Sequence, residues 1–250
     1  LDWKPLKVKD LEIEWAMTAL LKEAIKPNIV QTLENTPCFV HGWPFANIAH
    51  WCNSLIATKT ALKVSDFVIT EAWFGSDLWA EKFFDIKCRI GDLKPDAVVL
   101  VSTINSIKYN AWVSLENLEK PDLEALQKWI VNLEKHIENI LKYGLPIIIC
   151  LNKFLTDTDE EINFVKNFAT KKWVSFEVWE WFAKWWDGMT NLAKKLVNIL
   201  ENSENNFDFL YEKNISLKQK IEKIVTEIYW WSWVKYSQKA EESIKNLEKL

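Results

Sequence analysis

Residues 146–154 read PIIICLNKF, an apolar run that starts after a helix-like segment and ends in polar residues. A short run of this kind, rich in β-branched residues, is typical of a strand buried on both faces of a parallel sheet. Similar runs lie at residues 38–40, 66–70 and 97–103, with a weaker one at residues 174–178. We predict a buried parallel strand at each of these places and at residues 146–151.

Amphipathic helical patterns lie between and after these runs. Apolar residues recur at helical spacing in residues 11–25, 122–143, 159–168, 190–200 and 217–228. Lys142 and Gly144 supply the expected stop for the long helix at residues 122–143. The alternation predicts an α/β fold, a mostly parallel sheet flanked by helices with a helical, lysine-rich C-terminal part. We place a domain boundary between residues 1–151 and 152–250, with a change near residue 201 as the alternative.

Composition narrows the class of protein. With 49% hydrophobic and 26% charged residues, the chain has the balance of a globular protein. Its net charge of -4 and pI near 5.6 argue against a nucleic-acid surface, which needs clustered Lys and Arg. The four cysteines form no C-x-x-C pair, no apolar run nears the ~18 residues of a membrane span, and the start is not a signal peptide. We expect a cytoplasmic protein that acts on small molecules, without nucleic-acid or membrane partners.

Polar and aromatic residues follow the carboxyl ends of the predicted strands. In open α/β sheets, ligands bind at that edge. The sequence therefore predicts a ligand site there. The segments concerned are residues 41–45, 71–75, 105–108, 152–154 and 182–184.

Several blocks of sequence resemble formate–tetrahydrofolate ligase, and the resemblance runs essentially end to end. The first blocks are residues 31–37 (QTLENTP), 39–42 (FVHG), 44–50 (PFANIAH) and 57–61 (ATKTA). The later blocks are residues 81–89 (EKFFDIKCR), 93–98 (LKPDAV), 132–139 (NLEKHIEN) and 152–154 (NKF).

The resemblance implies a P-loop NTPase-like fold and an ATP-dependent ligase. In that family, formate and ATP give formyl phosphate, and tetrahydrofolate then takes the formyl group to become 10-formyltetrahydrofolate. The implied ligands are ATP with Mg and tetrahydrofolate as a substrate, with a monovalent cation left open, and the implied assembly is a homotetramer. On this basis residues 1–151 hold part of the nucleotide and formyl phosphate site, and residues 152–250 carry the folate-site aromatics.

The resemblance also implies roles for individual residues. The implied catalytic residues are Lys108 and His41, and the pterin ring lies between Phe154 and Phe182. The implied nucleotide and formyl phosphate residues are Trp43, Asn47, His50, Glu71, Phe74, Asn152 and Lys153. No metal ligand is assigned.

Structural roles remain open for the same residues. His41 and His50 could be satisfied core or turn residues, Lys108 could face solvent, and the aromatic side chains could be core packing. Asp77 and Glu81 could hold magnesium, but capping the following helix is the favoured role. The sequence departs from the family at Asn105, where arginine is usual, and at Ala111, where glycine is usual.

Tryptophan stands where the family has glycine. The chain has 16 Trp and 5 Gly, and together they make 21 of 250 residues, about 8%, close to the usual glycine content. Our hypothesis is that UGA codons, read as glycine in the source, were translated as tryptophan. The positions that match family glycines are Trp3, Trp15, Trp43, Trp51, Trp73, Trp79, Trp112, Trp129, Trp173, Trp185, Trp186, Trp230 and Trp233; the match is less clear at Trp179, Trp181 and Trp231.

The family's phosphate-binding loop, with its glycine-lysine-threonine core, has no match in these residues. We therefore expect an internal fragment that is inactive by itself. Two alternatives stay open: a non-catalytic paralogue or pseudogene remnant, and an unrelated tryptophan-rich module that stacks sugars or bases.

Overall fold

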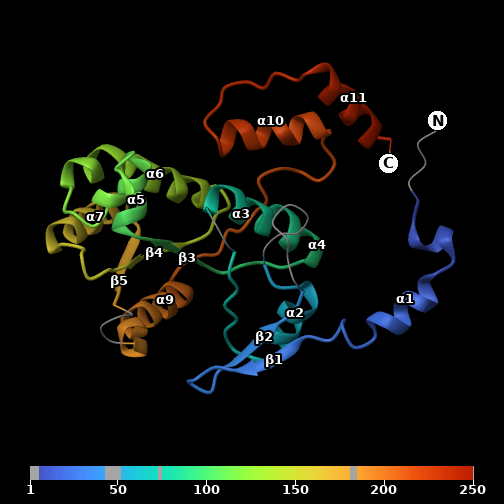
Figure 1. Cartoon of the computed structure of the whole chain (residues 1–250), viewed down its shortest axis with the longest axis horizontal. Helices are drawn as coiled ribbons and strands as arrows, with labels where there is room; N and C mark the ends of the chain where they lie inside the picture. Colours follow the sequence, from blue (N-terminus) through green and yellow to red (C-terminus); the bar gives the residue numbers. More distant parts are fainter. Residues whose placement is uncertain (1–5, 43–51, 73–74, 181–184, 250) are drawn as a thin grey trace. The chain divides into compact units, whose positions relative to one another are not determined.

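The computed structural model describes residues 6–42, 52–72, 75–180 and 185–249. The chain forms two compact units. One unit combines Leu1–Gly91 with Lys213–Leu250, and the other is Asp92–Glu212. Figure 1 shows the elements of both units along the chain.

The unit formed by Asp92–Glu212 is built on a parallel sheet. Its strands are β3 (Val98–Ser102), β4 (Ile147–Asn152) and β5 (Ser175–Trp179), in the order β3-β4-β5. Val98 lies opposite Ile147, and Asn152 lies opposite Trp179. The strands predicted at residues 97–103, 146–151 and 174–178 are confirmed, and so is the α/β class. Because the strands are parallel, their carboxyl ends share one edge.

Helices cover both faces of this sheet. Figure 1 shows α5, α6 and α7 on one face and α9 on the other. On the α9 side, the core consists of Ile148, Cys150, Leu192 and Ile199. The helices predicted at residues 122–143, 159–168 and 190–200 are confirmed. The elements are α5 (Ile104–Asn110), η3 (Leu115–Asn117), α6 (Leu123–Leu141), α7 (Asp159–Lys171), η4 (Trp185–Met189) and α9 (Thr190–Asn202).

The end of α6 shows why glycine is needed there. Gly144 has a φ of +71°, a left-handed conformation that strains residues with a side chain. A Cβ atom on Gly144 would lie 2.1 Å from the carbonyl oxygen of Asn206. The Asn206 N–H donates to the Gly144 carbonyl at 3.3 Å, so the two backbones lie in direct contact. The predicted helix stop at this position is confirmed.

The other unit contains a hairpin and several helices. Strands β1 (Asn28–Gln31) and β2 (Pro37–Val40) pair in antiparallel fashion. The predicted helices at residues 11–25 and 217–228 are present in shorter form. The helical elements are η1 (Val8–Leu11), α1 (Glu14–Leu21), α2 (Leu55–Val64), α3 (Ser76–Lys82), the π-helix η2 (Phe83–Cys88), α4 (Arg89–Gly91), α10 (Leu217–Glu227) and α11 (Gln238–Leu247).

Two strand predictions in this unit are wrong. Residues 38–40 form a strand, but it is neither buried nor parallel, because the turn at residues 32–36 folds it back onto β1. Residues 66–70 form no strand. Phe67 is 62% exposed and Ile69 is 86% exposed, so this apolar run is not covered as a buried strand would be. An apolar run alone therefore did not predict a buried strand at residues 66–70.

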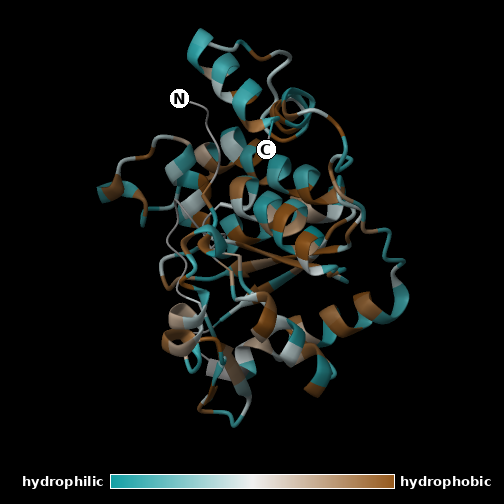
Figure 2. Ribbon diagram, turned by 90° about the vertical axis from the view of Figure 1, so that its right-hand side faces the viewer, coloured by the Kyte–Doolittle hydropathy of each residue, from teal (hydrophilic) through white to brown (hydrophobic). Residues whose placement is uncertain are grey.

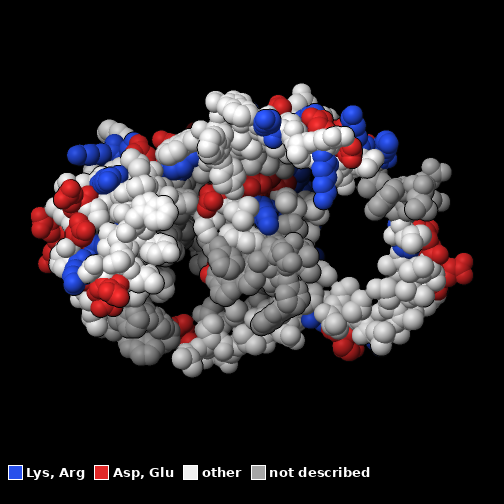
Figure 3. Space-filling view, turned by 45° about the horizontal axis from the view of Figure 1, so that its top comes forward, with Lys and Arg blue, Asp and Glu red and all other residues white. Residues whose placement is uncertain are grey.

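Colouring by hydropathy separates sheet from helices. In Figure 2 the strands near the centre are hydrophobic, while the helix ribbons alternate between hydrophilic and hydrophobic residues. Among the described residues on the face drawn in Figure 3, basic and acidic side chains are interspersed. That face therefore carries no basic stripe of the kind that tracks a nucleic-acid backbone.

The compact units do not follow the predicted domain boundary. Strand β4 runs across residue 151 and β5 lies after it, yet the two strands pair in one sheet and belong to one unit. The predicted boundary between residues 151 and 152 separates a nucleotide part from a folate part. In that functional sense it stays a prediction.

Among the described residues, three tryptophans adopt a left-handed backbone. The φ angles are 63° at Trp112, 58° at Trp173 and 60° at Trp230. Bulky residues rarely adopt this conformation, whereas glycine adopts it freely. Trp112 and Trp173 each follow a helix, where glycine is the usual residue.

The hydrogen bonds after α7 identify the type of helix C-cap at Trp173. The Trp173 N–H donates to the Thr170 carbonyl at 3.1 Å, and the Val174 N–H donates to the Ala169 carbonyl at 3.0 Å. This pair of bonds defines a Schellman C-cap, and its left-handed position falls on Trp173. The same pair of bonds follows α5, with Trp112 at the left-handed position. Both side chains are almost fully exposed, so they gain no packing in return.

Trp112→Gly and Trp173→Gly are each expected to raise the free energy of unfolding by about 1 kcal/mol, because left-handed strain is relieved and little packing is lost. The matched control is Trp129→Gly inside α6, where glycine should lower stability by about 1 kcal/mol or more. Urea unfolding of the three variants measures the differences. Destabilisation by all three changes would contradict the backbone argument.

Candidate functional site

The candidate site is the edge of the β3-β4-β5 sheet where the strands end. Thr103 follows β3 and caps α5, accepting from the Ser106 N–H at 2.9 Å. The loop that follows β4 leads to α7, which starts after Thr158. Glu180 directly follows β5. The parallel arrangement brings these segments to one edge, as the sequence predicted.

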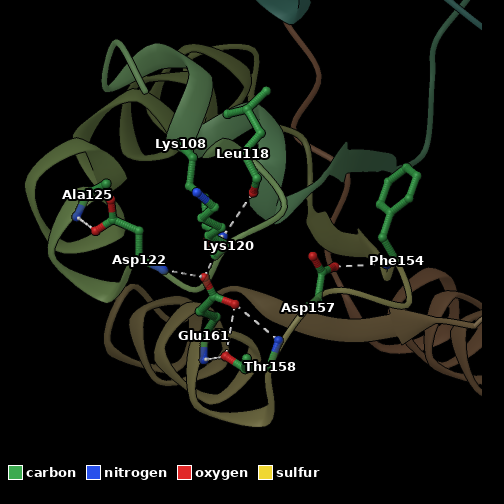
Figure 4. A network of polar contacts seen from close by, with 9 residues as sticks. All are labelled: Lys108, Leu118, Lys120, Asp122, Ala125, Phe154, Asp157, Thr158 and Glu161. Atoms are coloured by element: carbon green, nitrogen blue, oxygen red, sulfur yellow. Dashed lines mark hydrogen bonds and ion pairs between the residues drawn. The ribbon is translucent and has the colours of Figure 1, made fainter. Parts of the chain in front are cut away.

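A buried ion pair lies behind this edge. The Lys108 ammonium lies 2.6 Å from Oε1 of Glu161, and both side chains are 1% exposed. Lys108 also donates to the carbonyl oxygens of Leu118 at 3.2 Å and Lys120 at 2.8 Å (Figure 4). An ammonium has three N–H donors, and Lys108 therefore has an acceptor for each of them.

Glu161 joins three segments through the same carboxylate. Its Oε1 accepts from the Asp122 N–H at 3.1 Å, and its Oε2 accepts from the Thr158 N–H at 3.1 Å and hydroxyl at 2.8 Å (Figure 4). Burial by itself would raise the pKa of Glu161. The hydrogen bonds from Lys108, Asp122 and Thr158 outweigh burial and lower that pKa. The network ties α5, the start of α6 and the start of α7 together.

This geometry bears on the role expected for Lys108. The sequence offered two roles, charge for a phosphate or exposure to solvent. In the structure the ammonium is buried and held by Glu161 and two carbonyl groups. Exposure to solvent is therefore wrong, and a direct role in catalysis stays a prediction. What the geometry supplies is rigid support for the strand ends.

Lys108→Met is expected to lower the free energy of unfolding by about 3 to 5 kcal/mol, because it leaves the Glu161 carboxylate buried without its cation. Adding Glu161→Gln should recover part of this loss, since the neutral amide oxygen can still accept from Thr158. Urea unfolding of both single variants and the double variant gives the coupling energy. Additive losses, or a loss below about 1 kcal/mol for Lys108→Met, would contradict a buried, coupled pair.

The loop after β4 is held by Asp157. The Phe154 N–H donates to Oδ2 of Asp157 at 2.8 Å, and the Asp157 N–H donates back to the Phe154 carbonyl at 3.2 Å (Figure 4). Asp157 is 8% exposed, and burial raises the pKa of its carboxyl group. Phe154 is half-buried, and the adjacent Leu155 is 89% exposed. The loop thus holds the Phe154 backbone firmly at the sheet edge.

Asn152 ends β4, and Lys153 directly follows it. The Lys153 N–H donates to the Trp179 carbonyl at 3.0 Å, which extends the pairing of β4 with β5. The Lys153 ammonium lies 3.8 Å from Oε1 of Glu180. Both residues therefore lie at the predicted edge, although contact with a ligand stays a prediction.

His41 has partners for both ring nitrogens. Nε2 lies 2.9 Å from the Ala24 carbonyl oxygen, and Nδ1 lies 2.7 Å from Oγ of Ser54. A carbonyl only accepts, so Nε2 carries the proton and Nδ1 accepts from the Ser54 hydroxyl. Oγ of Ser54 in turn accepts from the Ala57 N–H at 3.0 Å and caps α2. His41 thus joins the end of β2 to α2, and its catalytic role stays a prediction.

The structure gives less information on the remaining predicted site residues. Glu71 is described and exposed, and no helix or strand contains it. Glu71 and His41 belong to the unit with the hairpin, whereas Lys108, Asn152, Lys153 and Phe154 belong to the sheet unit. Five further predicted residues lie outside the described part of the chain, namely Trp43, Asn47, His50, Phe74 and Phe182.

Acidic residues line one side of α3 and η2. Burial, followed by the negative charge of Asp85, raises the pKa of Glu81 to about 7, and Asp77 adds to the shift while Lys82 opposes it. Burial beside Asp77 and Glu81 raises the pKa of Tyr229 to about 12. Asp85 is already paired with Arg89 at 3.3 Å.

A magnesium site does not fit this cluster. Within residues 6–42, 52–72, 75–180 and 185–249, no group of three or more His, Cys, Asp or Glu is arranged to hold a metal ion. Asp77 lies in the first turn of α3, where its carboxylate suits the positive end of the helix, so the favoured role is confirmed for this residue. Gly75 is the N-cap and makes no side-chain capping hydrogen bond, and Glu81 lies near the other end of α3.

Glu81→Gln is expected to raise stability at pH 8 by about 1 to 2 kcal/mol, after allowance for solvent screening. The folded protein keeps the Glu81 proton up to about pH 7, whereas the unfolded chain releases it near pH 4.5, so stability falls between these values as pH rises. Below pH 4.5 the difference should vanish. Unfolding at several pH values measures it, with exposed Glu34→Gln as the control. Equal stability of Glu81→Gln and its parent at pH 8 would refute the assignment.

A second buried lysine was missed by the sequence reasoning. Lys87 is 5% exposed, and its ammonium donates to Oγ1 of Thr58 at 3.1 Å. Burial lowers the pKa of Lys87 and, with Lys87 opposing, raises that of the neighbouring Cys52 thiol. The only signal in the sequence was the FDIKC block, where a lysine interrupts apolar residues. The four cysteines are free thiols, as expected.

The fold is that of an α/β protein with polar residues at the carboxyl edge of a parallel sheet. Compared with known families, residues 1–250 match the family described as formate–tetrahydrofolate ligase. The chain belongs to the formate–tetrahydrofolate ligase family. In the described part of the chain, none of the helices has the length and apolarity to cross a membrane.

Proposed function

We propose that the protein catalyses or takes part in the ATP-dependent formation of 10-formyltetrahydrofolate from formate and tetrahydrofolate. The observation that carries the proposal is the Phe154 loop, held by Asp157 at the sheet edge of a chain that belongs to this family. A flat aromatic ring at such an edge suits a flat heterocyclic substrate.

The reaction has two steps. A formate oxygen attacks the γ-phosphorus of ATP, the bond from that phosphorus to the bridging oxygen breaks, and formyl phosphate and ADP form. N10 of tetrahydrofolate then attacks the formyl carbon, the carbon–oxygen bond to phosphate breaks, and N10 loses its proton. Both steps depend on positioning and charge stabilisation rather than on a protein nucleophile.

Individual residues have separate proposed roles in this reaction. Phe154 stacks on the pterin ring, with Phe182 as its proposed partner. Lys153 and the end of β4 line the neighbouring part of the site. Lys108 and Glu161 act as positioning residues, because their contacts hold the loops in place. All three N–H groups of Lys108 already have acceptors within the protein, so none is left for a substrate.

Several finer points rest on the family alone. These are the P-loop NTPase-like fold with its phosphate loop, ATP with Mg, a monovalent cation, a homotetramer and a cytoplasmic location. His41, Glu71 and the residues outside the described part keep their proposed roles near ATP or formyl phosphate on the same basis.

We also propose that glycine is the native residue at the tryptophan positions that match family glycines. The left-handed backbone of Trp112, Trp173 and Trp230 supports this. The codons decide it, since codons other than UGA at Trp112 and Trp173 would rule out the recoding.

A second candidate is a non-catalytic paralogue. Its motivation is Asn105, which replaces an arginine, together with an ammonium of Lys108 that is already engaged. Both candidates predict the same fold but different turnover.

The test is a turnover assay on the protein with glycine restored at the 13 clear positions and with the family's phosphate-binding loop supplied. We expect 10-formyltetrahydrofolate to form only when ATP, formate and tetrahydrofolate are all present. Phe154→Ala should weaken tetrahydrofolate binding by about 1 to 3 kcal/mol through lost stacking and burial. ATP binding serves as the control and should change little.

Two results would count against the proposal. A folded, glycine-restored protein that carries the phosphate-binding loop and binds tetrahydrofolate without turnover would favour the non-catalytic paralogue. Loss of ATP binding instead of folate binding in Phe154→Ala would assign this aromatic residue to the nucleotide.

A further inference from the structure

The sheet edge carries buried oxygen atoms without hydrogen-bond partners. They are Oδ1 of Asn105, Oδ1 of Asn152 and Oδ1 of Asp157. Asn105 lies in the first turn after β3, Asn152 ends β4, and Asp157 closes the loop after β4. A buried polar atom without a partner costs free energy, and native proteins rarely keep one without a function.

Asp157 is the strongest of the three. Its side chain is more than nine-tenths buried, and only one of its oxygens is used. Oδ2 accepts from the Phe154 N–H, which fixes the orientation of the carboxylate (Figure 4). Oδ1 is therefore held in a set direction beside the residue proposed to stack on the ring.

The chemistry of these atoms restricts the ligand. Each unpaired atom is an acceptor, so the group that meets it must bring N–H or O–H donors. Formate and the phosphate groups of ATP offer oxygen acceptors and would be repelled by the Asp157 carboxylate. The 2-amino-4-oxopyrimidine edge of a pterin offers an amino group and a ring N–H side by side. A carboxylate binds such an edge strongly, because hydrogen bonds to a charged acceptor are the strong ones.

We infer that Asp157 is the specificity-determining residue for the folate ring, accepting hydrogen bonds from its 2-amino and N3–H groups while Phe154 stacks on its face. The inference rests on the proposed function. The inference also changes the role proposed for Asn152. The sequence assigned this residue to the nucleotide or formyl phosphate, but its unpaired side-chain oxygen suits the donor groups of the ring edge better than a phosphate.

The test compares tetrahydrofolate with an analogue that carries a methyl group in place of the 2-amino group. Asp157→Asn keeps an oxygen for the Phe154 N–H but presents an amide N–H₂ where the ligand needs an acceptor. We expect the variant to bind tetrahydrofolate about 10- to 100-fold more weakly, because a donor then faces a donor. Binding of the analogue should change less than about threefold. Asp159→Asn, an exposed carboxylate two residues on, is the matched control.

The outcomes separate the possibilities. An equal loss for both ligands means that Asp157 only shapes the loop, and an unchanged affinity for tetrahydrofolate means that it does not touch the ring; either overturns the inference. A selective loss of ATP binding assigns the acceptor to adenine and also overturns it. If the folded parent protein fails to bind tetrahydrofolate at all, the proposed function itself fails.

Discussion

The buried pair of Lys108 and Glu161 is the contact on which the functional edge depends. Removing two charges from water is costly, and only close pairing together with further hydrogen bonds offsets that cost. Here the further bonds go to the backbone of Leu118, Lys120, Asp122 and Thr158. Leu118 and Lys120 lie in the connection between α5 and α6, and Asp122 and Thr158 are the N-caps of α6 and α7. The pair thus holds these segments in one arrangement.

A rigid edge suits the proposed chemistry. Phosphoryl and formyl transfer gain most from substrates that are held in place, because little covalent work falls to the protein. Phe154 gains its fixed position from Asp157, and α7, which begins just after Asp157, is fixed by Glu161. The buried pair therefore stabilises the start of α7 and, next to it, the loop of Phe154 and Asp157. We propose that this loop contacts the folate ring. An aromatic face and a carboxylate edge in one loop would recognise both aspects of a pterin.

The sequence predicted what depends on local pattern. Strand β4 follows from the isoleucine run, and the end of α6 follows from Gly144. It did not predict the partner of Lys108, because Glu161 lies far along the chain and only the fold brings the two together. Residues 66–70 misled for a related reason, since Phe67 and Ile69 are apolar but exposed. The tryptophan anomaly was visible in composition, yet the left-handed backbone at Trp112 and Trp173 is a property of the folded helix ends.

The most direct test of the account is a crystal structure of the glycine-restored protein with tetrahydrofolate bound. The account predicts the pterin ring stacked on Phe154 at the carboxyl edge of the β3-β4-β5 sheet, with its 2-amino group within hydrogen-bonding distance of Oδ1 of Asp157. The Lys108–Glu161 pair should remain intact. A pterin bound away from the end of β4, with Oδ1 of Asp157 still unpaired, would contradict it.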